Sequence, residues 1–188
     1  YVGELGWELY VPTEFVQDVF DRIIAEGADV GVRLAGYHAM NSLRLEKGYR
    51  SWEHDITDAD TPLEAGLGFA VAWDKPDGFI GRDALLRQRD AGVRRRLVHL
   101  AAGGSDRLLY HNEPIWRDGA LVGRTTSGMF GHTLGKPLAL GYIENHGAPV
   151  DDAFVTDGRY EIEIAGERVA AEVTLRPFYD PTGRRIRA

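Results

Sequence analysis

The second half of the chain limits the possible folds more than any other part. From Arg94 onward, short apolar runs recur about every 8–12 residues, a spacing typical of a small antiparallel barrel or sandwich. The turn dipeptides Asp118-Gly119 and Asp157-Gly158 separate some of them and are strong hairpin signals. The predicted strands are residues 97–101, 114–116, 120–122, 138–143, 153–156, 160–164 and 169–175. We therefore expect this half to form a compact β domain.

The sequence pattern of the first half predicts helices. After Pro12, Thr13 is a suitable N-cap, and apolar residues then repeat at helical spacing as far as Gly27. Further helices are predicted at residues 35–46, ending at Gly48, and from residue 80 to about Gly92. Pro62 favours a short helical turn over residues 61–64, and residues 69–73 are predicted as a strand. The fold class is therefore α+β, with a domain boundary near residues 90–95 that separates residues 1–92 from residues 93–188.

Composition excludes several functions. The 188 residues suffice for one large or two small domains, and the net charge of −7 argues against general nucleic-acid binding. No apolar run reaches the roughly 18 residues that would span a bilayer. The absence of cysteine removes disulfides and thiolate zinc sites, and the histidines lack metal-ligand spacing, so we expect no metal. The chain has no initiator Met and begins inside a turn, which predicts a fragment of a longer protein.

The opening octapeptide, Tyr1-Val-Gly-Glu-Leu-Gly-Trp-Glu8, carries the best candidate for chemistry. Residues 7–11 alternate apolar with polar or amphipathic side chains, which predicts a half-buried strand. Gly3 and Gly6 allow the backbone before it to turn sharply or to lie close to a ligand. Two interpretations of Glu8 are open: a solvated strand residue, or a carboxylate held beside an aromatic residue to bind a flat polar heterocycle.

A folate pterin suits the second interpretation. Its pyrimidine edge offers two adjacent N–H donors, and one carboxylate such as Glu8 can accept both in a charge-assisted, bidentate contact. Tyr1 can pack on the ring or donate its hydroxyl. Arg44, on the second predicted helix, has two candidate partners, Glu46 or a ligand.

Taken together, the motifs of the chain resemble the aminomethyltransferase family, which comprises the glycine-cleavage T-protein and its relatives. The opening octapeptide carries this resemblance first, and further motifs continue it in one order along the chain. They are Ser42-Leu-Arg-Leu-Glu-Lys-Gly48, Asp60-Thr-Pro-Leu-Glu-Ala-Gly66, Phe79-Ile-Gly-Arg-Asp-Ala-Leu85, Leu121-Val-Gly-Arg-Thr-Thr-Ser-Gly128 and Leu140-Gly-Tyr-Ile143. Residues 75–81 and the ending Pro177-Phe-Tyr-Asp-Pro181 look most like the C-terminal half of dimethylglycine or sarcosine dehydrogenases.

The resemblance implies a partial folate-binding domain followed by a small antiparallel β-barrel. In such proteins a FAD-dependent amine oxidase part precedes the folate part, and tetrahydrofolate captures the one-carbon unit of a small methylated amine as 5,10-methylenetetrahydrofolate. The motif's tyrosine and second glutamate, which contact the pterin, fall on Tyr1 and Glu8 here, and Trp7 lines the same turn. Arg44 and Tyr179 are weaker candidates for folate contact. Met40 is another, although T-proteins commonly carry an arginine at its place.

The resemblance places the catalytic aspartate and the FAD site upstream of Tyr1. We therefore expect no catalytic residue in this chain and no methylene transfer by the chain alone. Three alternatives for the parent protein stay open: a T-protein aminomethyltransferase, a folate-dependent demethylase of a sulfonium or ether, and a non-catalytic folate-binding or regulatory relative. The expected partners are folate, the amine and the upstream flavin domain, without nucleic acid or membrane. The expected location is the cytoplasm, or the mitochondrial matrix in a eukaryote.

Overall fold

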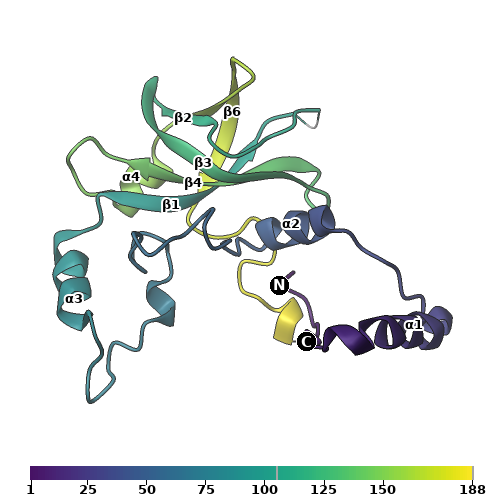
Figure 1. The fold of residues 1–188 in the computed structure, drawn as a ribbon. Helices are drawn as coiled ribbons and strands as arrows, with labels where there is room; N and C mark the ends of the chain where they lie inside the picture. Colours follow the sequence, from purple (N-terminus) through teal and green to yellow (C-terminus); the bar gives the residue numbers. More distant parts are fainter. Residues whose placement is uncertain (105, 188) are drawn as a thin grey trace.

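A closed antiparallel β-barrel forms the centre of the computed structural model, which describes residues 1–104 and 106–187 (Figure 1). Neighbouring strands follow the order β1-β4-β3-β2-β5-β6, and β6 pairs with β1 to close the barrel. The strands are β1 (Arg95–Ala102), β2 (Pro114–Arg117), β3 (Ala120–Gly131), β4 (Lys136–Glu144), β5 (Tyr160–Ile164) and β6 (Glu167–Thr174). The predicted fold class, α+β with a C-terminal barrel, is confirmed.

Strand β1 shows how the sequence pattern builds two cores. Side chains alternate across a strand, so Val98 and Leu100 enter the barrel interior, where both are fully buried. Leu97 and Ala101 leave the opposite face and belong to a second buried cluster outside the barrel, which includes Leu45. Because both faces of β1 are covered, its sequence reads as a continuous apolar run around His99.

The Asp118-Gly119 hairpin between β2 and β3 is confirmed. Asp118 has φ 49° and Gly119 has φ 82°, so both central residues take the left-handed conformation that a tight hairpin turn requires. Arg117 and Ala120 are the last paired residues on either side of the turn.

Helix α2 (Tyr37–Glu46) packs on the outside of the barrel against β3 and β4, as Figure 1 shows. Leu45 fills the cluster outside the barrel, and the Ser42 hydroxyl donates a 2.6 Å hydrogen bond to the Phe130 carbonyl at the end of β3. The helix predicted at residues 35–46 is therefore confirmed, and one of its faces packs on the outer surface of the barrel.

Helices α1 (Val16–Gly27) and α3 (Arg82–Ala91) confirm the other two helix predictions but extend away from the barrel (Figure 1). Gly27 is the only buried residue of α1, and α3 has none. Thr13 does not cap α1, because it lies within a 3₁₀ turn, η1 (Thr13–Phe15), that precedes the helix. Short 3₁₀ turns also follow α1, at η2 (Ala28–Val30), and end the described chain, at η4 (Arg185–Arg187).

Two predicted strands are wrong because no neighbouring strand pairs with them in the described part of the chain. Residues 7–11 are irregular, and Trp7 and Leu9 are exposed rather than buried in a core. Residues 69–73 are also irregular, beginning within a 3₁₀ turn, η3 (Gly68–Ala70). A segment with alternating side chains forms a strand only when a partner strand supplies the backbone hydrogen bonds.

The strand predicted at residues 153–156 is also wrong. The segment forms a short helix, α4 (Asp152–Thr156), because the Asp151 carboxylate accepts a 2.7 Å hydrogen bond from the Phe154 amide and caps the first turn. Asp157-Gly158 consequently connects this helix to β5 and is not a hairpin turn. The local N-cap at Asp151 therefore determines the structure of this segment, although its apolar pattern predicts a strand.

Candidate functional site

The opening motif is anchored at its start. The ring of Tyr1 lies 5.7 Å from the ring of Tyr49, between centroids, and its hydroxyl donates a hydrogen bond to the Arg50 carbonyl. Burial raises the pKa of the Tyr1 hydroxyl, an effect that the nearby Arg44 guanidinium opposes. Gly3 is buried against the stem of Lys47. The motif therefore begins on the loop that follows α2.

The rest of the motif faces solvent. Trp7 is 89% exposed, and Glu8 is exposed beside it. The Tyr10 hydroxyl donates a 2.9 Å hydrogen bond to Glu8 Oε2, and this bond raises the pKa of Tyr10. The structure thus holds Tyr1 against α2's end and leaves Trp7 and Glu8 on an open surface. Their predicted contact with folate stays a prediction.

Arg44 is buried in a polar network, at 5% exposure. Its guanidinium donates to Asp55 Oδ2 at 2.7 Å, to Ser127 Oγ at 2.8 Å and to the Tyr49 carbonyl at 3.0 Å. Asp55, only 1% exposed, also accepts a 2.5 Å hydrogen bond from the Thr126 hydroxyl. The network joins α2, the loop after it and β3.

The sequence-based interpretation of Arg44 missed its partner. Of its two candidate partners, Glu46 is wrong, because side chains two positions apart on a helix leave it in different directions and Glu46 faces the β3–β4 turn. There Glu46 Oε1 accepts hydrogen bonds from the amides of Thr133 at 2.7 Å and Leu134 at 3.1 Å. No local spacing signals the true partner, Asp55, since the network that holds it includes a strand distant in sequence.

The two remaining candidates lie at different places. Met40 is half-buried on α2. Tyr179 is half-buried in the tail after the barrel, where Lys47 Nζ lies 5.2 Å from its ring centroid. Tyr179 therefore shares a neighbour, Lys47, with the start of the motif.

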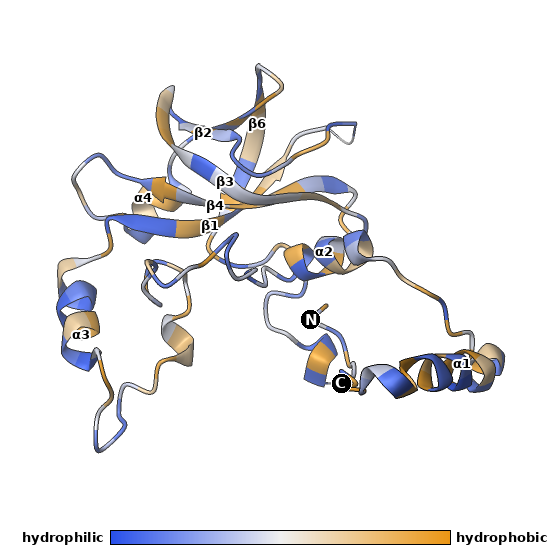
Figure 2. Ribbon diagram, viewed as in Figure 1, coloured by the Kyte–Doolittle hydropathy of each residue, from blue (hydrophilic) through white to orange (hydrophobic). Residues whose placement is uncertain are grey.

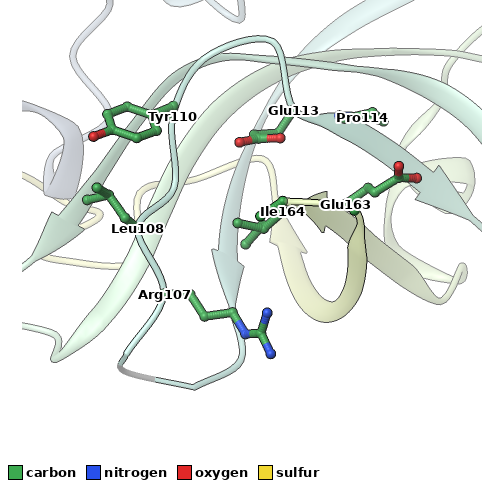
Figure 3. Close-up of a pocket in the computed structure, with 9 residues that line it drawn as sticks. Arg107, Leu108, Tyr110, Glu113, Pro114, Glu163 and Ile164 are labelled. Carbon is green, nitrogen blue, oxygen red and sulfur yellow. The ribbon is translucent and has the colours of Figure 1, made fainter.

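A groove of about 550 Å³ opens on the barrel, between residues 107–114 and the turn joining β5 to β6 (Figure 3). Glu113 points its carboxylate into this groove, whereas the Glu163 carboxylate points away from its centre and accepts a 3.0 Å hydrogen bond from Trp116 Nε1. Burial, reinforced by the Glu163 charge, raises the pKa of Glu113. This groove and three further cavities, beside α3, at the Asp118–Gly119 turn and between β1 and β6, have no lining residue from the opening motif. These four cavities are thus separate from the predicted ligand surface.

The described residues contain no group of three histidine or acidic side chains placed to hold a metal ion. None of their helices has the length and apolar character needed to cross a bilayer.

Comparison with known proteins matches both halves of the chain. Residues 1–75 match the family model "GCVT N-terminal domain", and residues 95–180 match "Glycine cleavage T-protein C-terminal barrel domain". The fold is similar to the aminomethyltransferase T of the Bartonella henselae glycine cleavage system, with a TM-score of 0.75 and 26% identity, over 91% of this chain and 45% of that one.

Two curated relatives match along all of this chain, each at 43% identity. They are the 4-methylaminobutanoate oxidase (formaldehyde-forming) of Paenarthrobacter nicotinovorans and the mitochondrial sarcosine dehydrogenase of Mus musculus, of which the chain spans 22% and 20%. The chain is thus about a fifth as long as these relatives. The resemblance inferred from the motifs is confirmed. The chain belongs to the glycine cleavage T-protein family, with residues 1–75 in its GCVT N-terminal domain and residues 95–180 in its C-terminal barrel domain.

Proposed function

We propose that this chain is the folate-binding part of a longer one-carbon enzyme of the dimethylglycine or sarcosine dehydrogenase type. Two of its relatives are named as a formaldehyde-forming 4-methylaminobutanoate oxidase and a sarcosine dehydrogenase, and the chain spans only about a fifth of each. The FAD-dependent oxidation of the methylated amine then belongs to the rest of the longer protein. The product of the folate part is 5,10-methylenetetrahydrofolate.

The opening motif carries the proposal. Glu8 presents an exposed carboxylate beside the exposed Trp7, on a segment that Tyr1 anchors through Tyr49 and Arg50. A carboxylate and an aromatic side chain fit the paired N–H donors and the flat face of a pterin. Bound tetrahydrofolate supplies the nitrogens that accept the one-carbon unit. The chain's own residues bind and orient its ring: Glu8 by accepting two hydrogen bonds, Trp7 by packing.

Glu8 also has a hydrogen bond to exchange on binding. The Tyr10 hydroxyl already occupies Oε2. Since both side chains are exposed, the exchange leaves no buried group unpaired. Burial of the carboxylate between the ligand and the remainder of the domain strengthens the contact with the pterin by lowering the local dielectric.

The substitution Glu8→Gln tests the proposal in the full-length protein. The amide retains the shape but loses the charge and one acceptor, so we expect the affinity for 5-formyltetrahydrofolate, measured by calorimetry, to fall roughly 10- to 100-fold. Glu4→Gln, an exposed glutamate of the same motif, is the matched control and retains wild-type affinity. Unchanged affinity in Glu8→Gln would show that the motif does not bind folate.

A second test concerns the chain by itself. The resemblance places the family's catalytic aspartate upstream of Tyr1. Residues 1–188 alone are therefore expected to form no 5,10-methylenetetrahydrofolate from formaldehyde equivalents above the uncatalysed rate. Robust turnover by this chain, followed by absorbance in a coupled assay, would contradict the assignment of the catalytic part to the longer protein.

We propose a cytoplasmic location, or the mitochondrial matrix in a eukaryote. The sarcosine dehydrogenase relative is named as mitochondrial, which supports the second location.

A further inference from the structure

Lys47 lies where three distant segments of the chain meet. It follows the last residue of α2, and its side chain is 3% exposed. Its stem contacts Gly3 of the opening motif, and its ammonium group lies 2.5 Å from Asp180 Oδ2 in the tail after the barrel. One side chain thus touches both the predicted folate motif and the C-terminal tail.

On the motif side, the contact leaves no space. Gly3 is buried with φ 74°, and a Cβ at this position would overlap Cγ, Cδ and Cε of Lys47. The glycine is therefore required both by its left-handed backbone and by the Lys47 stem. Since Gly3 precedes Glu8 in the same short segment, its position sets where that segment begins.

On the tail side, Asp180 organises a turn while it holds Lys47. Its carboxylate accepts hydrogen bonds from the amides of Arg184 at 2.9 Å and Arg185 at 3.1 Å, and it is 10% exposed. Figure 1 shows the tail returning from the barrel to the neighbourhood of the N-terminus. The hydrogen bond from Lys47 is the main cause that lowers the pKa of Asp180 to about 2, so the carboxylate is ionised at neutral pH.

The pair differs from the surface ion pairs of the same molecule. Lys136 of β4 and Glu172 of β6 form an ion pair at 2.8 Å, but their side chains are 46% and 66% exposed. Exposed pairs restrain little, because water and salt screen them and both side chains stay mobile. A buried pair fixes its partners, since separation would leave a charge without water or counter-ion.

We propose that Lys47 and Asp180 are positioning residues, which clasp the C-terminal tail to the start of the opening motif and thereby direct Glu8 toward the folate. Neither residue contacts the ligand in this role. The inference rests on the proposed function for its last step, and on the contacts of Lys47 alone for the clasp itself.

Backbone mobility tests the clasp without any ligand. In the wild-type chain, the NMR order parameters of residues 2–5 should be those of a rigid backbone, about 0.85, and in Asp180→Asn they should fall below about 0.6, because the Lys47 stem loses its fixed position. Asp180→Glu, which keeps the charge, should restore most of the order. Glu172→Gln is the control and leaves the order parameters of residues 2–5 unchanged. Equal order parameters in Asp180→Asn and the wild type would overturn the clasp.

Folate binding by the full-length protein tests the consequence. Lys47→Met and Asp180→Asn should each weaken the binding of 5-formyltetrahydrofolate about tenfold. The double variant should be no weaker than either single one, because both remove the same link. A lower melting temperature with unchanged affinity in both single variants would overturn the positioning role. Unchanged affinity in Glu8→Gln would instead refute the proposed function, and the order parameters of residues 2–5 would still decide on the clasp.

Discussion

The barrel with α2 and the outlying helix α1 have equally regular sequence patterns but very different surroundings. In the barrel, Leu100, Ile115 and Leu140 are completely buried, whereas Phe20 and Ile23 on α1 remain 45% and 42% exposed. Figure 2 shows apolar residues on the ribbon of both regions. The difference teaches that periodicity suffices to form an element, while its contribution to stability depends on the surface that covers it.

Polar groups follow the same division. Arg44 and Asp55 pair where both side chains are almost fully buried, and Asp18 and Arg22 pair on α1 where they are 66% and 76% exposed. The first pair joins α2 to the loop that follows it, and both of its side chains also form hydrogen bonds with β3, whereas the second pair joins two turns of one helix. We expect the loss of unfolding free energy to differ most between the two regions when such buried charges are substituted.

The largest expected effect is therefore that of Arg44→Met. It leaves the Asp55 carboxylate buried without its cation, which should cost about 3–5 kcal/mol of unfolding free energy. Arg22→Met on α1 is the matched change and should cost no more than about 0.5 kcal/mol. Urea unfolding at neutral pH measures both, and similar losses in the two variants would break the comparison.

Apolar truncation should give the next largest difference. Leu100→Ala opens a cavity inside the barrel and should cost about 3 kcal/mol. Phe20→Ala removes an exposed ring from α1 and should change the stability by about 0.5 kcal/mol or less. A large loss for Phe20→Ala would mean that α1 is covered by another surface in solution.

The buried His99 of β1 should make the stability of the barrel depend on pH. Burial, assisted by the nearby Arg50 charge, lowers the pKa of His99 to about 3. The unfolded chain, with a histidine pKa of about 6.5, then binds more protons than the folded one between pH 3 and 6.5. This group's contribution to stability is complete above about pH 6.5 and is lost as the pH falls, by roughly 2–3 kcal/mol at pH 4.5.

The variant His99→Leu should lack this component, so its stability should fall less between pH 6.5 and 4.5 than that of the wild type. Leu100→Ala, which is destabilised without losing a titratable group, should keep the wild-type slope. Urea unfolding across this range measures the slopes, and identical slopes in His99→Leu and the wild type would contradict the burial of a neutral histidine.

The smallest difference concerns two threonines at helix-like starts. Thr61 and Glu64 form a reciprocal capping box: the Thr61 amide donates to Glu64 Oε2 at 3.0 Å, and the Glu64 amide donates to Thr61 Oγ1 at 3.2 Å. Thr61→Ala should therefore cost about 1 kcal/mol. Thr13→Ala, in a 3₁₀ turn without a side-chain cap, should be nearly neutral. Equal losses in thermal unfolding would show that the Thr61 cap adds nothing.

Much of the fold could be predicted because its signals are local. The helices at residues 16–27, 37–46 and 82–91 follow from apolar periodicity and terminal glycines, and the Asp118-Gly119 turn follows from residues that tolerate positive φ. Most barrel strands follow from short apolar runs between such turns. The segment at residues 152–156 failed because the Asp151 cap was overlooked, although this cap is also a local signal.

The site could be predicted only as a motif. The order of residue types named Tyr1, Trp7 and Glu8 as folate contacts, and these contacts stay a prediction. Their arrangement could not be predicted: residues 7–11 read as a strand but lack a partner in the described chain, and Arg44 read as a ligand or Glu46 contact but pairs with Asp55. Contacts between distant segments have no signature in residue spacing.

The sequence by itself determined the family, the helix positions and the alternating faces of the barrel strands, because each of these depends on chemistry within a few residues. Only the tertiary structure decided which of these faces are covered, which charges are buried, and that Lys47 meets both Gly3 and Asp180. The physical reason is that burial and ion pairing depend on the distance in space between segments, which chain closure fixes and local sequence does not.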